Sequence, residues 1–183
     1  TDSIMDETLP TRLEVLEEIK HHKNDSTILL ASTGKGGREL FEIEDTKNNL
    51  YMVGSMGCVS SIGLGIALNN PDIHVIAIDG DGALLMRMGS LATNGFYRPK
   101  NLLHILLDNG CHDSTGGQET VSANVNFVKI AYESGYNKAV ASNNVTIIGT
   151  VSKDWKKNII LTFLHVKIKK GSKNNLGRPT VLP

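Results

Sequence analysis

Short apolar runs alternate along the chain with segments that have the pattern of helices. The runs at 26–31, 74–79 and 102–107 are rich in branched side chains and have the length of buried strands. The segment at 11–22 places leucine and isoleucine three positions apart, which predicts a helix, and a glycine-rich helix is expected at 56–68. Strands that alternate with crossover helices predict a parallel sheet.

The same alternation continues through the rest of the chain. Further strands are expected at 51–54, 138–141 and 159–167. Further helices are expected from 82 to about 94, at 127–134 and at 144–153. About six strands with crossover helices predict a doubly wound α/β fold, in which a mainly parallel sheet carries helices on both faces.

The length of 183 residues is enough for one domain with a full core. We therefore expect a single domain over residues 1–183, with its core at 11–170. The segment at 171–183 is polar and punctuated by glycine and proline, which is typical of a linker or a frayed terminus.

Composition and charge exclude several classes of function. Nineteen basic residues balance nineteen acidic ones, so no overall field favours nucleic acid or an anionic membrane. The apolar runs are well below the roughly 20 residues that span a bilayer. The two cysteines, Cys58 and Cys111, cannot build a disulfide framework, and the first residues do not have the pattern of a signal peptide. A reducing, cytoplasmic location is expected.

A carboxylate lies between two glycines where the strand at 74–79 ends. Gly80 and Gly82 let the backbone approach a ligand, and free N–H groups at the start of the following helix favour an anion such as phosphate. Asp81 puts a negative charge in the same place, which is reasonable if a divalent cation lies between carboxylate and phosphate. Mg²⁺ commonly binds in this way. A purely structural strand–turn–helix connection is the alternative.

The next strand along the chain ends in a second polar cluster. Asn109 follows Asp81 by 28 residues, and its side-chain carbonyl is a neutral oxygen ligand. The carboxyl ends of adjacent parallel strands meet at one edge of a sheet, so both groups are expected there. A main-chain carbonyl in the turn after Asn109 could supply a third oxygen, and Gly110 would let that turn fold back. Neither a dinucleotide fingerprint nor a Walker A loop is present.

Gly-Asp-Gly followed after about thirty residues by a strand-terminal asparagine resembles the cofactor motif of the thiamine-diphosphate (TPP) decarboxylases. The resemblance implies that TPP and Mg²⁺ are the cofactors. It implies that Asp81, Asn109 and the backbone carbonyl of Cys111 ligate Mg²⁺. It also implies that Gly82 and Ala83 offer backbone N–H groups to the diphosphate.

Two further segments resemble cofactor-contacting parts of that family. By analogy, the carbonyl of Gly54 receives the amino group of the cofactor's pyrimidine ring, beside Ser55. Met56 would be the bulky residue that holds the two rings of TPP in a bent conformer. The segment at 32–35 after the first strand, with Thr33 and Gly34, would close over the diphosphate; capping of the following helix explains Ser32 and Thr33 equally well.

Similarity to one branch of the family is closest at 53–68 and 80–122. These segments resemble the C-terminal domain of phosphonopyruvate decarboxylases and, slightly less, the β subunit of sulfopyruvate decarboxylases; the string at 112–118 favours the former. The implied substrate is a small 2-oxo acid, 3-phosphonopyruvate. The implied reaction gives phosphonoacetaldehyde and CO₂ in phosphonate biosynthesis. Asp108 stands where the family usually has a first asparagine.

The polar loop after the expected metal site is the candidate substrate contact. His112 could transfer a proton or bind an anion. Ser114, Thr115 and Gln118 could donate hydrogen bonds to a phosphonate. Such polar loops are also common before helices, so a purely structural loop is an equally good interpretation.

The resemblance also implies a partner. Enzymes of this family need a pyrimidine-binding domain whose glutamate activates the cofactor, and no segment of this chain corresponds to it. We expect the chain to be one subunit of an α/β pair or a piece of a longer enzyme, to function in a homo- or hetero-oligomer, and to be inactive alone. Two alternatives stay open: another TPP-dependent decarboxylase or carboligase, and a binding domain without catalysis.

Overall fold

In the computed structural model, which describes residues 8–180, a parallel sheet of six strands forms the centre of the molecule. Its strands are β1 (Ile28–Ala31), β2 (Asn49–Tyr51), β3 (Val75–Gly80), β4 (Leu102–Asp108), β7 (Lys138–Ser142) and β8 (Thr162–Lys167). They lie in the order β2-β1-β3-β4-β8-β7, and every pair is parallel. The predicted doubly wound α/β fold is confirmed.

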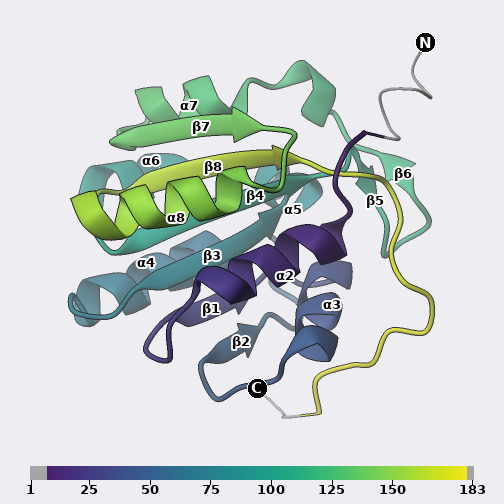
Figure 1. The fold of residues 1–183 in the computed structure, drawn as a ribbon. Coiled ribbons are helices and arrows are strands. Elements are labelled where there is room, and N and C mark those ends of the chain that lie inside the picture. Colours follow the sequence, from purple (N-terminus) through teal and green to yellow (C-terminus); the bar gives the residue numbers. More distant parts are fainter. Residues whose placement is uncertain (1–7, 181–183) are drawn as a thin grey trace.

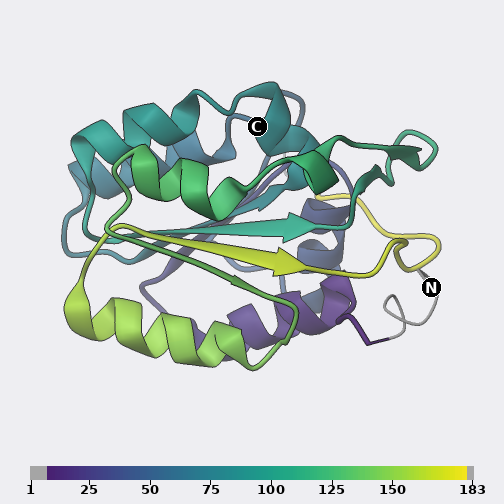
Figure 2. The same cartoon turned by 90° about the horizontal axis from the view of Figure 1, so that it is seen from above.

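Helices cover both faces of this sheet (Figures 1 and 2). One face carries α2 (Arg12–His22), α3 (Lys35–Ile43) and α8 (Ile147–Asn158), and the other carries α4 (Val59–Asn69), α5 (Asp81–Met86), α6 (Ser90–Tyr97) and α7 (Phe127–Glu133). Adjacent strand residues point to opposite faces of the sheet. Leu29 therefore packs in the core beneath α2, α3 and α8, and Leu30 packs in the core on the other face. None of the helices within residues 8–180 is both long and apolar enough to span a membrane.

Element boundaries differ from the expected ones where local hydrogen bonding decides them. The helix expected from 82 to 94 is two helices, because the Arg87 N–H bonds the Leu84 carbonyl and closes α5 with a tight turn. The helix α8 begins later and ends later than expected. Ile159, in the left-handed conformation at φ 49°, ends it.

The polar loop after β4 contains structure that the sequence pattern did not reveal. Residues 111–112 (β5, Cys111–His112) and 118–119 (β6, Gln118–Glu119) form a small antiparallel hairpin beyond the end of the sheet (Figure 1). A short 3₁₀ helix, η1 (Ser122–Asn124), follows it. The hairpin turns the chain back over the ends of β3 and β4.

The segment at 171–180 is docked on α3, contrary to the expectation of a linker or frayed end, and residues 181–183 of that expected tail lie outside the described part of the chain. Leu176 is buried, and Arg38 donates to the carbonyls of Leu176 and Gly177. In return, the Gly177 N–H donates to Glu42 at 2.7 Å. These bonds hold the segment beside the helix, and Figure 1 draws it as a yellow coil.

Candidate functional site

A cavity lies at the carboxyl ends of β1, β3 and β4, and we call it the central cavity. The doubly wound fold forms ligand sites at this end of its sheet. Of the residues predicted to form the site, the following line it: Thr33, Met56, Gly80, Asp81, Gly82, Ala83, Asn109, Cys111, His112 and Ser114. The sheet therefore brings together the two strand-end clusters that the sequence predicted to meet.

Two of the three carboxylates at these strand ends have basic partners. Asp79 accepts from His104 on β4 at 3.3 Å, and both side chains are fully buried. Asp108 accepts from His165 at 2.8 Å and from Lys167 at 2.6 Å. Burial alone would raise the pKa of Asp108, but these contacts and the Ser122 hydroxyl hold that pKa well below its usual range.

Asp81, the third carboxylate, has no basic partner within residues 8–180. It is 2% exposed and accepts a hydrogen bond from the Thr120 hydroxyl. Burial raises the pKa of Asp81, and the Thr120 hydroxyl opposes this shift while the nearby Asp108 reinforces it. A buried carboxylate stabilised by neutral groups alone favours a cation that is not part of the chain.

The turn after β4 presents oxygen atoms to the same cavity. The Asn109 side-chain carbonyl accepts from the Cys111 N–H at 3.2 Å, while its NH₂ group donates to Asp113 at 2.7 Å. The Gly110 carbonyl accepts from the Thr120 N–H, so these two residues form a hydrogen-bonded pair next to the β5–β6 ladder. Hydrogen-bonded and non-hydrogen-bonded pairs alternate along an antiparallel ladder, so the carbonyl of the next residue, Cys111, takes no part in the β5–β6 hydrogen bonds. Asn109 and Cys111 thus offer one side-chain and one main-chain oxygen.

The Cys111 thiol does not have the character of a metal ligand. Burial and the nearby Asp113 raise the pKa of Cys111 to about 12, so the sulfur stays protonated and donates to Asp113 at 3.1 Å. In the described part of the chain, no cluster of three or more His, Cys, Asp or Glu side chains is arranged to hold a metal. A cation here would need main-chain and ligand oxygens beside Asp81, as Mg²⁺ sites with phosphates do.

A hydroxyl without a partner in residues 8–180 lines the central cavity just after β1. Ser32, at the end of β1, is 8% exposed, and its Oγ has no hydrogen-bond partner within residues 8–180. The helix α3 begins just beyond, with Gly34 at its N-cap and no side-chain cap. The alternative that Ser32 or Thr33 caps this helix is therefore wrong. Free N–H groups at the helix start and an unsatisfied hydroxyl both suit an anionic ligand.

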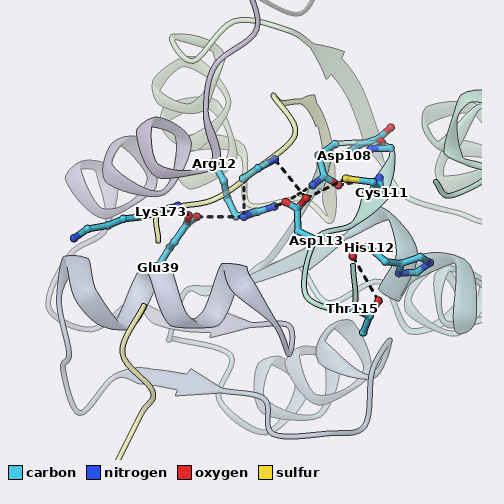
Figure 3. A network of polar contacts seen from close by, with 11 residues as sticks. Arg12, Glu39, Asp108, Cys111, His112, Asp113, Thr115 and Lys173 are labelled. Carbon is cyan, nitrogen blue, oxygen red and sulfur yellow. Dashed lines mark hydrogen bonds and ion pairs between the residues drawn. The ribbon is translucent and has the colours of Figure 1, made fainter. Parts of the chain in front are cut away.

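A buried arginine connects the site to the rest of the domain (Figure 3). Arg12, the first residue of α2, lies 3.5 Å from Glu39 on α3 and 2.5 Å from Asp113 in the hairpin. Asp113 also accepts from Asn109, so the arginine indirectly fixes which way the Asn109 amide faces. Gly171, at the start of the docked C-terminal segment, bonds both Arg12 and Asp113.

Other predicted site residues lie at the margin of the central cavity. Gly54 and Ser55 are exposed, have positive φ values of 74° and 46°, and do not line it. Gly34 lines a neighbouring groove, close to Ser114. Thr115 is exposed, and its hydroxyl donates to Gln118 at 3.1 Å within the hairpin turn, which places it outside the cavity.

Sequence reasoning missed several residues that support this site. Arg12 and Asp113 meet across 101 positions, and no local pattern reveals such a contact. One signal was available: a cation in the first turn of a helix is unfavourable, so Arg12 at that place suggests a specific partner. No sequence pattern points to His104 or His165, although both are buried beside strand-end carboxylates.

Gly82 has a steric role beside His112 that can be tested. A Cβ atom added at Gly82 would lie 2.3 Å from the His112 ring, which must then move away. Since alanine favours the helix α5 by about 1 kcal/mol, we expect Gly82→Ala to keep the thermal midpoint but to displace the imidazole. A histidine-selective NMR spectrum should show a shifted His112 signal, and an unshifted signal would contradict this packing.

The chain belongs to the family of thiamine pyrophosphate enzymes: the model for their C-terminal TPP-binding domain matches residues 38–160. Over 174 residues it is 41% identical to a phosphonopyruvate decarboxylase of Streptomyces viridochromogenes, covering 95% of this chain and 44% of that protein. Over 161 residues it is 35% identical to the sulfopyruvate decarboxylase subunit beta of Methanothermobacter thermautotrophicus, covering 88% of this chain and 83% of that subunit.

The fold is also that of solved enzymes of this class. A thiamine diphosphate-dependent 4-hydroxybenzoylformate decarboxylase of Rhodococcus jostii superposes with a TM-score of 0.76 at 17% identity, over 91% of this chain and 34% of that one. At this identity the likeness shows the fold alone. This chain spans less than half the length of the phosphonopyruvate decarboxylases that it matches.

Proposed function

We propose that this chain supplies the Mg²⁺–diphosphate half of a TPP-dependent enzyme that decarboxylates 3-phosphonopyruvate to phosphonoacetaldehyde and CO₂. The observation that carries the proposal is Asp81, a buried carboxylate without a basic partner in residues 8–180, in the same cavity as Asn109. The identity of 41% to phosphonopyruvate decarboxylases supports the choice of substrate.

The residues of the central cavity fit the diphosphate end of the cofactor. Asp81, the Asn109 side-chain oxygen and the Cys111 carbonyl would hold Mg²⁺, which prefers hard oxygen ligands and phosphates together. Backbone N–H groups of Gly82 and Ala83 would face the diphosphate, and the unpartnered Ser32 hydroxyl would bind it from the β1 side. When bound, TPP would supply the electron sink that loss of CO₂ requires.

The other predicted residues would act around the reacting end of the cofactor. Gly54 and Ser55 would border the pyrimidine ring, and Met56, which lines the cavity, would hold the bend between the rings. His112 and Ser114 face the cavity from the hairpin, where a proton donor and a hydroxyl could meet the substrate. Thr115 is assigned a supporting role in the turn.

A partner completes the proposed enzyme. The family resemblance implies a pyrimidine-binding domain that carries an activating glutamate, either in a longer chain or in a second subunit. The match to 83% of a sulfopyruvate decarboxylase β subunit and to 44% of a phosphonopyruvate decarboxylase fits both arrangements. The exposed Gly54–Ser55 turn beside the cavity is where we place the contact with that domain.

The test is a turnover assay with and without the partner domain. With TPP and Mg²⁺, the complete enzyme should release CO₂ from phosphonopyruvate and form phosphonoacetaldehyde, trapped as a hydrazone. This chain alone should release none. Turnover by the chain alone would contradict the partner proposal, and a complete enzyme inactive on every 2-oxo acid offered would contradict the reaction.

Sulfopyruvate decarboxylation is the second candidate, because the chain covers most of the β subunit of such an enzyme. The two substrates differ in the anionic group, so the same active site could hold either. Side-by-side measurement of kcat/KM separates them: we expect phosphonopyruvate to exceed sulfopyruvate by at least about tenfold, or about 1.4 kcal/mol. A ratio in the opposite direction would assign the chain to the sulfonate branch.

A further inference from the structure

A second groove, which we call the basic groove, adjoins the central cavity on the α3 side. It has a volume of about 350 Å³ and is bordered by three cationic side chains, Lys35, Arg38 and Arg178. Lys35 and Arg38 come from the first two turns of α3, and Arg178 comes from the docked C-terminal segment. Among residues 8–180, no aspartate or glutamate side chain lines the groove.

Two of the three cations of this groove have no counter-charge within the described part of the chain. Neither Lys35 nor Arg178 has an ion-pair partner in residues 8–180, whereas Arg12 nearby contacts two carboxylates. Arg38 donates to the main-chain carbonyls of Leu176 and Gly177, and its charge also acts on Glu42, which does not line the groove. Clustered cations without counter-charges repel one another, so the groove favours an anionic ligand.

Arg38 also explains how Arg178 reaches the groove. Its guanidinium bonds the carbonyls just before Arg178, and the buried Leu176 side chain anchors the same stretch. The Gly177 N–H bond to Glu42 fixes the segment from the other side. The C-terminal segment is thus held in a defined position in which Arg178 lines the same groove as Lys35.

The basic groove is continuous with the parts of the chain that border the central cavity. Thr33, Lys35 and Ser114 line both hollows. Met52 and Val53, on the third side, lead directly into the turn at Gly54. An anion in the groove therefore lies next to Thr33 and Gly34, which are expected to close over the diphosphate, and next to the turn that we assign to the pyrimidine ring.

We propose that the basic groove is the specificity subsite for the phosphonate end of the substrate, with Lys35 and Arg178 as the direct contacts and Arg38 as a positioning residue. The inference rests on the proposed function and adds to it the residues that select the anionic group. A phosphonate can carry two negative charges and a sulfonate carries one, so clustered cations favour the phosphonate.

Phosphonoacetate, which has the phosphonate and a carboxylate but no ketone, is a suitable probe. With the complete enzyme loaded with TPP and Mg²⁺, calorimetry should give a Kd about tenfold higher for Arg178→Gln than for the wild type. Arg178 does not line the central cavity, so the Kd for TPP should stay unchanged in this variant. Lys157→Gln, at the opposite end of the sheet in the last turn of α8, is the matched control and should change neither value.

Two further variants separate direct contact from positioning. Lys35→Gln should weaken the binding of phosphonoacetate at least tenfold and the binding of sulfoacetate by less. The reason is that the more highly charged probe is attracted more strongly by each cation. Arg38→Gln should release the C-terminal segment from α3 and so weaken the binding of phosphonoacetate indirectly. Limited proteolysis should then cut the variant near residue 176. An uncut Arg38→Gln segment with unchanged affinity would remove Arg38 from the proposal.

The outcomes distinguish this inference from the proposed function. If Arg178→Gln and Lys35→Gln leave the phosphonoacetate Kd unchanged while the wild type still decarboxylates phosphonopyruvate, the subsite is wrong and the function stands. If both variants weaken the binding of TPP as much as that of phosphonoacetate, the cations bind the diphosphate of TPP and the proposed subsite is again wrong. If the wild type binds no TPP, the proposed function itself fails.

Discussion

Replacing Asp81 with asparagine should stabilise the ligand-free chain and, in the complete enzyme, abolish Mg²⁺-dependent binding of TPP. The carboxylate is buried without a cationic partner in the described residues, and burial raises its pKa. A raised pKa gives stability that is fully present below the unfolded value, about 3.9, and is lost as pH rises through the folded pKa. At neutral pH the ionised carboxylate therefore destabilises the fold, and asparagine removes that charge while keeping the shape.

The two effects of Asp81→Asn are measured separately. The thermal midpoint of the ligand-free chain should be higher than that of the wild type at pH 7.5, and the difference should shrink as the pH is lowered toward 4. Calorimetry on the complete enzyme should show TPP binding weakened by more than about 100-fold, since even outer-shell residues of metal sites contribute 10–100-fold. Asp72→Asn, at an exposed position, is the control. A lower midpoint with unchanged TPP binding would mean that Asp81 has a structural role instead.

Arg12→Met should destabilise the domain by about 3–5 kcal/mol, the cost of leaving buried charges without their partner. Arg12 is 8% exposed and lies between Glu39, 2% exposed, and Asp113. Methionine keeps much of the side-chain volume and removes the charge, so both carboxylates lose their counter-ion. Asp113 would also lose the contact that fixes it against Asn109, so cofactor binding should weaken as well.

Urea unfolding measures the stability of this variant, and its pH dependence tests the cause. Burial alone would raise the pKa of Asp113, but the Arg12 guanidinium lowers this pKa below its usual value. A lowered pKa gives stability that is present above about pH 4 and is lost as the pH falls further. Without Arg12 that contribution disappears, so the variant should lose less stability than the wild type below pH 4. Lys20→Met on the same helix is the control: its pair with Glu44 is part-exposed at 3.6 Å and should contribute at most about 1 kcal/mol. Equal losses in both variants would contradict the buried cluster.

The fold was accessible from the sequence because local patterns agree with it. The apolar runs that became β3 and β4 are buried on both faces, as a central parallel strand requires. The register pairs Ile78 with Ile105, so the residues that follow both strands reach the same edge. That is why Asp81 and Asn109 could be expected to meet. Gly63, in the glycine-rich helix, packs closely on the sheet: a Cβ there would lie 3.3 Å from Ala77 and Leu102.

The parts that sequence reasoning missed depend on contacts between distant segments. The segment at 171–180 is polar, and it is docked because Arg38 and Glu42 satisfy its backbone groups and Leu176 is buried. Glycine and proline content alone suggests a loose tail, since composition contains no information about which helix lies nearby. The Arg12–Asp113 pair and the basic groove depend on the same tertiary arrangement.

The most direct test of the central claim is a calorimetric titration of TPP into the complete enzyme, once with Mg²⁺ and once with all divalent metal removed. The account predicts one TPP bound for each copy of this chain in Mg²⁺, and binding at least about 100-fold weaker without it, because Asp81 then faces the diphosphate with no cation between them. Equal affinities in the two titrations would contradict the Mg²⁺–diphosphate site at the ends of β3 and β4.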